Sequence, residues 1–295
     1  MQHCNMIQTE NNNYNPLPWY DSVEKQDFRK WYAYGAVYPL FAPANILLPW
    51  QITRDHRTNN ITAVEMYDKA GTLIADITQP MLDAGLQIVQ TDDYPGKDII
   101  IYPANQYMAT DMQNGQYYLR LTDGVQEWYS EVLTIVQDST PYLRIMWNDV
   151  ENAVFDSGVI VYRDPIKYRN LLYFNASIGK PDYDFEETGE NRDGYYFAEK
   201  QVSTKTYKFT ILAPEYLCDC MRFIRLSDRV SINAGGVDYN CDTFLITPKW
   251  EGAGALASVE CEFTTQTVVK KIGQGYIKDT HGDYNNDFNN DYNND

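Results

Sequence analysis

Two cysteines, Cys218 and Cys220, lie in a segment with helical periodicity and raise the question of a metal or redox site. On a helix of ~3.6 residues per turn, residues two apart point ~200° away from each other. A Cys-x-x-Cys pair instead places both sulfurs on one face, as zinc sites and redox motifs require. None of the three histidines, His3, His56 and His281, lies nearby in the sequence. The spacing therefore predicts core thiols.

An acidic segment, residues 179–193, is the second candidate. Its carboxylates are Asp182, Asp184, Glu186, Glu187, Glu190 and Asp193. A catalytic carboxylate pair or a calcium site would need such groups, but no EF-hand ligand order is present and no pair stands apart. We expect an exposed loop that is either solvated or used in a subunit contact.

The C-terminal segment, residues 276–295, carries an aspartate every fourth residue. These are Asp279, Asp283, Asp287, Asp291 and Asp295, and the last four are separated by aromatic-Asn-Asn triplets. On a helix the like charges would repel at i,i+4 spacing, and Asn and Asp favour turns. We expect a disordered acidic Asp/Asn tail in the free chain. Its aromatic residues, Tyr284, Phe288 and Tyr292, share the period of four and are candidate subunit contacts.

No nucleophile elbow, zinc-protease motif or dinucleotide fingerprint occurs, and the segment around Gly235 and Gly236 is typical of a hairpin turn. We therefore predict that the protein is not an enzyme and assign no catalytic residue, cofactor or metal ligand. The net charge of -17 argues against nucleic acid and anionic membranes as partners. No apolar run approaches the ~18 residues of a membrane-spanning helix. The odd, sparse set of five cysteines is typical of a chain folded in a reducing cytoplasm.

The elements around these residues are mostly strands. Short alternating segments with turns between them predict a β-sandwich over residues 45–137. Residues 115–136 are similar to the last two strands of an immunoglobulin- or fibronectin-like domain. Residues 138–275 are predicted to form a second β-rich domain with one helix, 214–226, which begins at a proline and places Leu217 and Ile224 on one side. The fold class is thus mainly β.

Residues 1–44 form a proline-broken arm with a short helix expected within residues 22–34. Four of its aromatic residues, Trp19, Phe28, Trp31 and Tyr38, are too apolar for a free tail. The arm packs either on its own domain or on a neighbouring subunit. The second alternative makes these four residues candidate subunit contacts.

Several runs of the second domain, among them 193–197, 213–219, 242–250 and 259–271, resemble uncharacterised structural proteins of tailed bacteriophages and prophages of gut Bacteroides-type bacteria. The resemblance covers residues 45–275 and carries no catalytic motif. It implies a tail, tail-tip or baseplate component of a virion, folded in the cytoplasm of the host bacterium. The implied partners are further copies of the chain and other virion structural proteins.

Two other classes of function stay open. A receptor- or glycan-binding adhesin module, with a host-surface glycan as partner, would gather aromatic side chains together with Asp and Asn in one open groove. A glycosidase would instead need two carboxylates converging on one bond.

Overall fold

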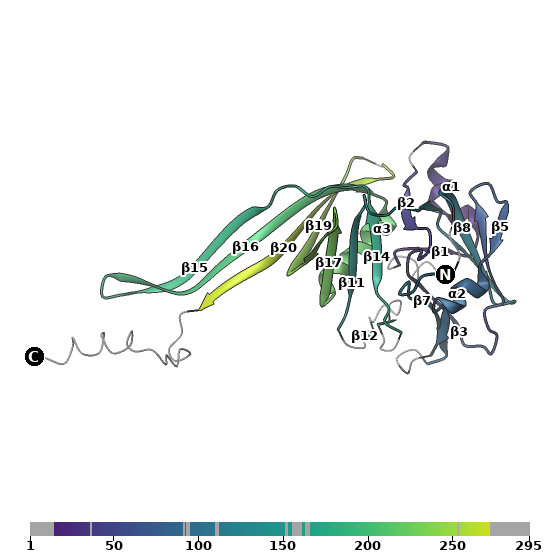
Figure 1. Cartoon of the computed structure of the whole chain (residues 1–295), viewed down its shortest axis with the longest axis horizontal. Helices are drawn as coiled ribbons and strands as arrows, with labels where there is room; N and C mark the ends of the chain where they lie inside the picture. Colours follow the sequence, from purple (N-terminus) through teal and green to yellow (C-terminus); the bar gives the residue numbers. More distant parts are fainter. Residues whose placement is uncertain are drawn as a thin grey trace, which may run out of the picture. The chain divides into compact units, whose positions relative to one another are not determined.

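The computed structural model describes residues 15–35, 37–90, 92, 95–109, 112–150, 153–154, 161–162, 166–252 and 254–271. The chain is mainly β, as predicted, and its strands form several sheets (Figure 1). It divides into two compact units. Unit 1 is made from the segments Met1–Asp182 and Lys205–Gln266, and unit 2 from Tyr183–Thr204 and Thr267–Asp295.

The largest sheet lies in unit 1 and has the order β1-β9-β8-β10-β2-β14-β11-β17-β18, with β4 on the other edge of β8 and β5 beyond β4. Its strands are β1 (Trp19–Tyr20), β2 (Leu40–Pro43), β4 (Ala63–Asp68), β5 (Leu73–Asp76), β8 (Gly115–Thr122), β9 (Glu127–Ser130), β10 (Leu133–Val136), β11 (Leu143–Asn148), β14 (Asn170–Phe174), β17 (Arg229–Ala234) and β18 (Val237–Asn240). Nearly all neighbours are antiparallel, but β10 and β2 run parallel.

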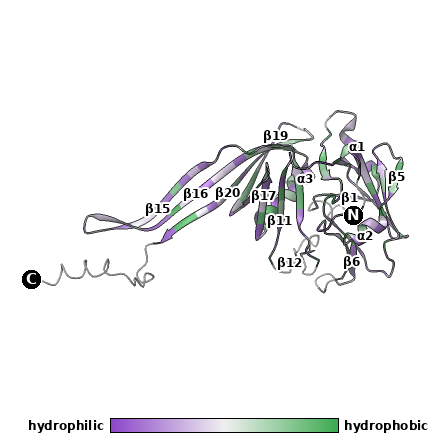
Figure 2. Ribbon diagram, viewed as in Figure 1, coloured by the Kyte–Doolittle hydropathy of each residue, from purple (hydrophilic) through white to green (hydrophobic). Residues whose placement is uncertain are grey.

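Three smaller sheets complete the strands. The order β3-β7-β6 joins β3 (Trp50–Asp55), β7 (Lys97–Tyr102) and β6 (Gln87–Val89). A short ladder pairs β12 (Ala153–Val154) with β13 (Val161–Tyr162). The order β15-β16-β20-β19 joins β15 (Asp182–Arg192), β16 (Tyr195–Ala213), β20 (Ala257–Lys271) and β19 (Thr243–Trp250). Hydrophilic and hydrophobic residues are mixed along β16 and β20 (Figure 2). In the first part of β20, from Ala257, buried and half-buried side chains alternate with the period of a strand.

The predicted helix at 214–226 is confirmed. It consists of α3 (Glu215–Met221) and a 3-10 turn, η2 (Arg222–Leu226), with Pro214 at the N-cap. Leu217 and Ile224 are fully buried, as their spacing predicted. The short helix expected near residues 22–34 is also present, as η1 (Val23–Lys25) and α1 (Asp27–Tyr32). A further helix, α2 (Thr78–Asp83), was not predicted.

One apolar core joins the largest sheet to the three-stranded sheet. Trp50 of β3 and Tyr102 of β7 belong to the same buried cluster as Leu119 of β8 and Trp147 of β11. Trp50 also packs against Trp19 of β1, with ring centroids 4.6 Å apart. Two sheets facing one core is the packing of a β-sandwich.

The expected domain boundary between residues 137 and 138 does not divide the structure. β2 lies between β10 and β14, so strands from both sides of that boundary pair in one sheet. Leu133 and Trp147, one from each expected domain, are both completely buried in the shared cluster. The sequence pattern located the strands but not the pairing between strands that are far apart in the sequence. That pairing decides which segments belong to one domain.

The acidic segment 179–193 is a second correction. Residues 182–192 form strand β15, and not a loop, although its side chains are exposed as expected. Asp193 and Gly194, both at positive φ, turn the chain directly into β16. Both central residues of a type I′ hairpin turn have positive φ, and Asp-Gly is a preferred pair there.

Candidate interaction surfaces

Unit 2 has no core within the residues whose side chains the structure describes. Every one of them in 183–204 and 267–271 is exposed or half-buried, and none is buried. Four aromatic side chains stand out: Tyr183, Phe185, Tyr195 and Tyr196 are between 53% and 73% exposed. We call the segment 183–204 the aromatic ribbon. Strands need a buried hydrophobic face, or packing against a helix, for independent stability, and the described side chains of this ribbon supply no such face.

The aromatic ribbon is also strongly acidic. It carries six Asp or Glu and two Lys or Arg residues, a formal charge of -4. Within the part of the chain that the structure describes, its strand β15 has a neighbour on one side only in the sheet order. An edge strand exposes backbone donors and acceptors that a partner strand can pair with. Aromatic contact area, negative charge and a free edge therefore occur together.

The N-terminal arm, by contrast, folds into unit 1. β1 pairs antiparallel with β9, and the Trp19 indole is 2% exposed. The side chain of Gln26 donates to the carbonyl of Ser130 over 2.6 Å. Phe28 packs with Tyr118 and Val132 in a small cluster of its own. Packing on its own domain is thus the alternative that the structure shows.

Glu131 is the residue that fastens the arm. Its carboxylate accepts hydrogen bonds from the backbone N–H groups of Asp27 (2.7 Å), Phe28 (3.1 Å) and Val132 (2.9 Å) and from the Tyr20 hydroxyl (3.1 Å). Burial raises the pKa of the Glu131 carboxyl, and the three backbone donors oppose that rise. The bonds to Asp27 and Phe28 satisfy two N–H groups at the start of α1 that have no partner within the helix.

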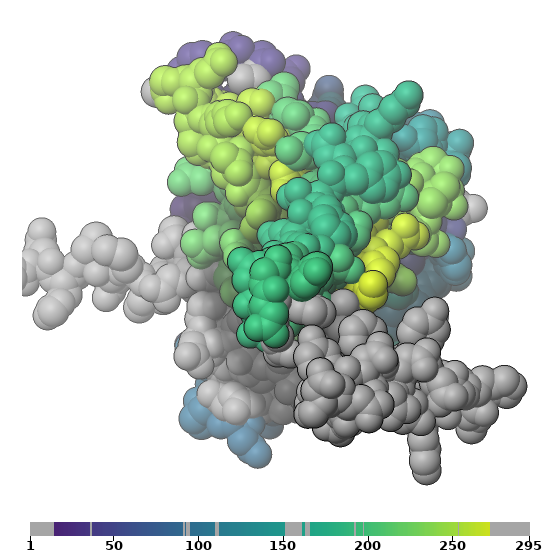
Figure 3. Space-filling view, turned by 90° about the vertical axis from the view of Figure 1, so that its left-hand side faces the viewer, coloured from purple at the N-terminus to yellow at the C-terminus, as the bar shows by residue number. Residues whose placement is uncertain are grey.

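An open groove of about 560 Å3 lies between α3 and β19 in unit 1. Glu215, Cys218, Asp219 and Arg222 line it from the helical side, and Ile246, Pro248, Trp250 and Gly254 from the strand and the turn after it. Trp250 is 44% exposed. Figure 3 shows β19 and that turn in yellow-green at the molecular surface. Burial raises the pKa of Asp219, as does the charge of Glu215, while Arg222 lowers it. The three charged groups therefore act on one another.

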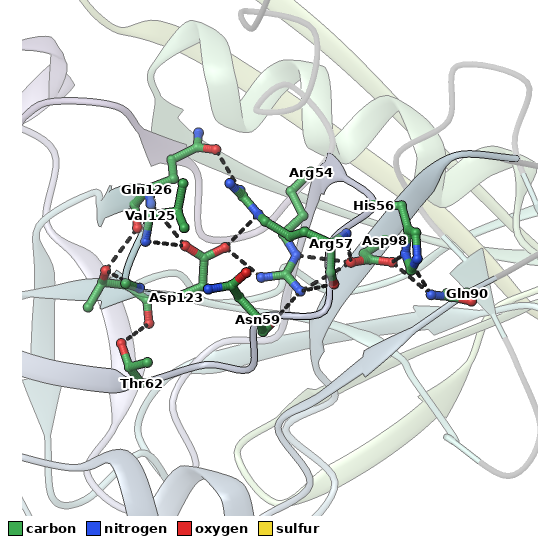
Figure 4. Close-up of polar contacts among 12 residues, drawn as sticks. Arg54, His56, Arg57, Asn59, Thr62, Gln90, Asp98, Asp123, Val125 and Gln126 are labelled. Carbon is green, nitrogen blue, oxygen red and sulfur yellow. Dashed lines mark hydrogen bonds and ion pairs between the residues drawn. The ribbon is translucent and has the colours of Figure 1, made fainter.

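A buried network of charges joins β3, β7 and the turn after β8 (Figure 4). The Arg54 guanidinium donates to Asp123 (2.5 Å) and to Asp98 (3.1 Å), and all three side chains are at most 1% exposed. Arg57 pairs with Asp123 over 2.8 Å. Burial disfavours the charged form of Asp98 and Asp123 and so acts to raise their pKa values. Hydrogen bonds outweigh this effect, mainly from the His56 ring to Asp98 and from backbone N–H groups to Asp123. Both pKa values are therefore lowered.

His56 is the half-exposed end of this network. Its Nδ1 lies 2.7 Å from Asp98 Oδ1 and 2.8 Å from Gln90 Nε2. An Asp–His pair can activate a nucleophile, but no hydroxyl or thiol in the described part of the chain hydrogen-bonds to His56. The network holds strand ends together, and each buried charge in it has a partner.

The structure divides the candidate contact residues of the sequence into three groups. Trp19 and Phe28 are buried and Tyr38 packs half-buried against the main core, so these three side chains make their contacts within the chain itself. Trp31 is half-buried and stays a candidate. It stacks edge-on with the exposed Tyr34 at 5.9 Å. The tail residues Tyr284, Phe288 and Tyr292 lie outside the described residues, as does the whole segment 276–295.

The cysteines of α3 are buried, as the spacing predicted, and Cys218, Cys220, Cys241 and Cys261 are all free. Within the described ranges no three His, Cys, Asp or Glu side chains are grouped closely enough to hold a metal ion. In the same ranges no helix is long and apolar enough to cross a bilayer.

Sequence reasoning missed Arg54, Asp98, Glu131 and the groove at Trp250. Asp123 was recognised only as part of the turn before Gly124. A basic residue in a β-strand opposite an acidic one is a usable signal, but Arg54 and Asp98 are 44 residues apart and only their pairing brings them together. Glu131 interrupts an apolar strand pattern, which is a signal that a buried polar group has a special role.

No protein-family model matches this sequence, and no curated protein matches it significantly. The function has to be argued from the arrangement of the residues.

Proposed function

We propose that this chain is a structural subunit of a bacteriophage virion, a component of the tail, tail tip or baseplate that acts through contacts between subunits. The observation that carries the proposal is the aromatic ribbon of unit 2, which has no buried side chain among those described and four exposed aromatic residues. The resemblance of residues 45–275 to phage structural proteins points to the same class of function.

The energetics of the aromatic ribbon favour a partner. Ordering a residue costs ~1–2 kcal/mol of backbone conformational entropy. A strand normally offsets that cost by burying one face, but here Tyr183 and Phe185 on β15 and Tyr195 and Tyr196 on β16 remain exposed. Burying an aromatic side chain contributes about 1.5–3 kcal/mol. Covering four of them would supply a substantial part of what the ribbon lacks alone.

The charge of the aromatic ribbon selects the kind of partner. Because each aromatic ribbon has a formal charge of -4, two ribbons placed face to face would repel each other. The acidic segment 276–295 would repel the ribbon for the same reason. A neighbouring virion protein with Lys or Arg around an apolar patch would suit both the charges and the aromatic rings. Tyrosine, phenylalanine and arginine are the residue types enriched at interfaces of this kind.

A second contact surface lies beside α1. Tyr32 and Tyr34 are exposed and Trp31 is half-buried. Because Glu131 holds this helix on unit 1, these rings are presented from a fixed position. This part of the arm thus contributes a small aromatic patch on the surface of unit 1 and does not extend away from it as a flexible segment.

The test is incorporation into particles. The chain is supplied in trans to a phage that lacks it, and purified virions are analysed by quantitative mass spectrometry. We expect wild-type chain at a fixed copy number and loss of incorporation for the fourfold variant Tyr183→Ser, Phe185→Ser, Tyr195→Ser and Tyr196→Ser. The matched control is Tyr107→Ser, which removes an equally exposed tyrosine from unit 1.

Tyr107→Ser should retain the thermal midpoint of the wild type, because one exposed side chain away from special contacts changes stability by ~0.5 kcal/mol or less. The fourfold variant carries four such substitutions, so its loss of unfolding free energy should stay within about 2 kcal/mol. Absence of the wild-type chain from purified virions would contradict the proposed class of function. Normal incorporation of the fourfold variant would contradict the role of the aromatic ribbon.

A further inference from the structure

The groove between α3 and β19 has two walls of different chemistry. Residues 246, 248 and 250 are two apart on one strand and so face the same side, which makes this wall apolar and aromatic. Glu215, Asp219 and Arg222 recur at i, i+4 and i+7 along α3 and its 3-10 extension, which makes the opposite wall charged. We propose that this groove binds a neutral carbohydrate.

The aromatic wall fits one side of a sugar ring. A pyranose has a face of C–H groups that packs on an aromatic plane. Trp250 has the largest such plane and is 44% exposed at the end of β19. Pro248 and Ile246 continue the apolar surface inward, and Ile246 rests on the main core, so the wall has a firm support.

The charged wall fits the edge of the same ring. A hydroxyl group both donates and accepts hydrogen bonds. The carboxylates of Glu215 and Asp219 can accept hydrogen bonds from sugar hydroxyls, and the guanidinium of Arg222 can donate to them. The wall therefore offers both the acceptors and the donors that a hydroxyl needs. Such charge-assisted hydrogen bonds are stronger than neutral ones. A volume of about 560 Å3 lies within the usual range of small-ligand sites, roughly 300–1,000 Å3.

Electrostatics disfavours anionic sugars. Two carboxylates and one guanidinium leave the groove at -1, inside a chain whose net charge is -17. Sulfated or uronic-acid polymers would be repelled on approach. A lysine-rich peptide would meet Arg222 on the same wall as the carboxylates, so a neutral ligand with many hydroxyls matches the groove better.

The arrangement fits binding and not cleavage. Glycosidases place two carboxyl groups on opposite sides of the scissile bond. Glu215 and Asp219 are four residues apart on one helix, and the opposite wall is apolar. We therefore expect a bound glycan to remain intact.

The experiment uses the purified full-length chain on a glycan array that includes neutral mannose, glucose, galactose and N-acetylhexosamine oligomers together with heparin fragments. Hits are quantified by isothermal titration. We expect a neutral glycan to bind and heparin not to bind. Trp250→Ala should weaken the affinity at least tenfold, and Asp219→Asn should weaken it severalfold. Mass spectrometry of the recovered ligand should show no cleavage.

Lys249→Ala is the matched control, because Lys249 is adjacent to Trp250 on the other face of β19, where it pairs with Glu260. Its affinity should equal that of the wild type. The inference is overturned if no neutral glycan on the array binds, if Trp250→Ala binds as tightly as Lys249→Ala, or if heparin or a lysine-rich peptide is the preferred ligand. The assay needs no particle, so its outcome is independent of the proposed virion role.

Discussion

The Glu131 carboxylate offers the sharpest test of how the N-terminal arm is held. Its Oε2 accepts from the Asp27 N–H and the Tyr20 hydroxyl, and its Oε1 accepts from the N–H groups of Phe28 and Val132. In Glu131→Gln one of the two oxygens becomes an NH2 group, which can only donate. We expect this isosteric change to destabilise the protein and to release α1.

The magnitude follows from counting the donors. With the NH2 group in the Oε2 position, the Tyr20 hydroxyl can rotate and accept, so a single buried N–H, that of Asp27, loses its acceptor. An unsatisfied buried donor costs about 1–3 kcal/mol, and each bond that remains loses up to about 1 kcal/mol when its acceptor is no longer charged. Removing the buried charge offsets part of this cost. The expected net loss is about 2–3 kcal/mol of unfolding free energy.

Urea unfolding at pH 7, followed by tryptophan fluorescence, measures the loss. Hydrogen exchange supplies the local readout, because the amides of Asp27 and Phe28 should lose protection before the rest of the sheet. Glu251→Gln is the control, since it makes the same chemical change at an exposed side chain. A loss for Glu131→Gln no larger than that of the control, or unchanged protection in α1, would refute this account.

Three further predictions concern the core, the acid response and the thiols. Residues 45–137 expressed alone should give an unfolded circular-dichroism spectrum, because β2 and β14 are then missing from their sheet. Asp98→Asn should cost about 3–5 kcal/mol at pH 7, measured by urea unfolding, because Arg54 then loses half of its buried pairing. Since the folded pKa values of Asp98 and Asp123 are lowered, the unfolded state binds more protons at low pH, and their contribution should be constant above about pH 5 and fall as the pH drops through ~4 and below. That fall should be shallower in Asp98→Asn. In a Cys4→Ser variant, a thiol reagent at pH 8 should label the native chain slowly, because burial raises the pKa of Cys218 to about 11 and of Cys241 to about 12, and reductant should leave the thermal midpoint unchanged. Rapid labelling would contradict the prediction that these thiols are protected by burial. A thermal midpoint several degrees lower in reductant would contradict the prediction that no disulfide stabilises the fold.

Local periodicity predicted those elements whose buried face is encoded nearby. The 214–226 helix was found because its proline start and its apolar spacing agree. Strand β8 lies within residues 115–136, where alternating segments separated by turns were expected to form strands. The second of the two strands expected within 115–136 is divided into β9 and β10 at Glu131, whose carboxylate turns inward to meet the arm. No local rule shows which distant backbone will supply the donors for such a group.

Long-range pairing explains the other differences between expectation and structure. The parallel contact of β2 with β10 joins residues more than 90 positions apart and removes the expected boundary at 137. The strand β15 was taken for a loop because a strand is recognised by one apolar face, and here neither face is buried. The groove at Trp250 could not be found from the sequence, since its walls come from segments that only the fold brings together.

The aromatic residues of this chain serve two purposes, and backbone pairing decides which. Trp19 and Phe28 looked available for a neighbouring subunit, but β1 pairs with β9 and Glu131 fixes α1, so both side chains are buried within unit 1. Tyr183 and Tyr195 lie on strands that pair with each other, and among the described residues both side chains remain exposed. When no layer covers an aromatic strand, only its hairpin turn and its hydrogen bonds to neighbouring strands stabilise it. These two contributions are small. The proposed subunit contact therefore moves from the arm, where it was one of two alternatives left open by the sequence, to the aromatic ribbon.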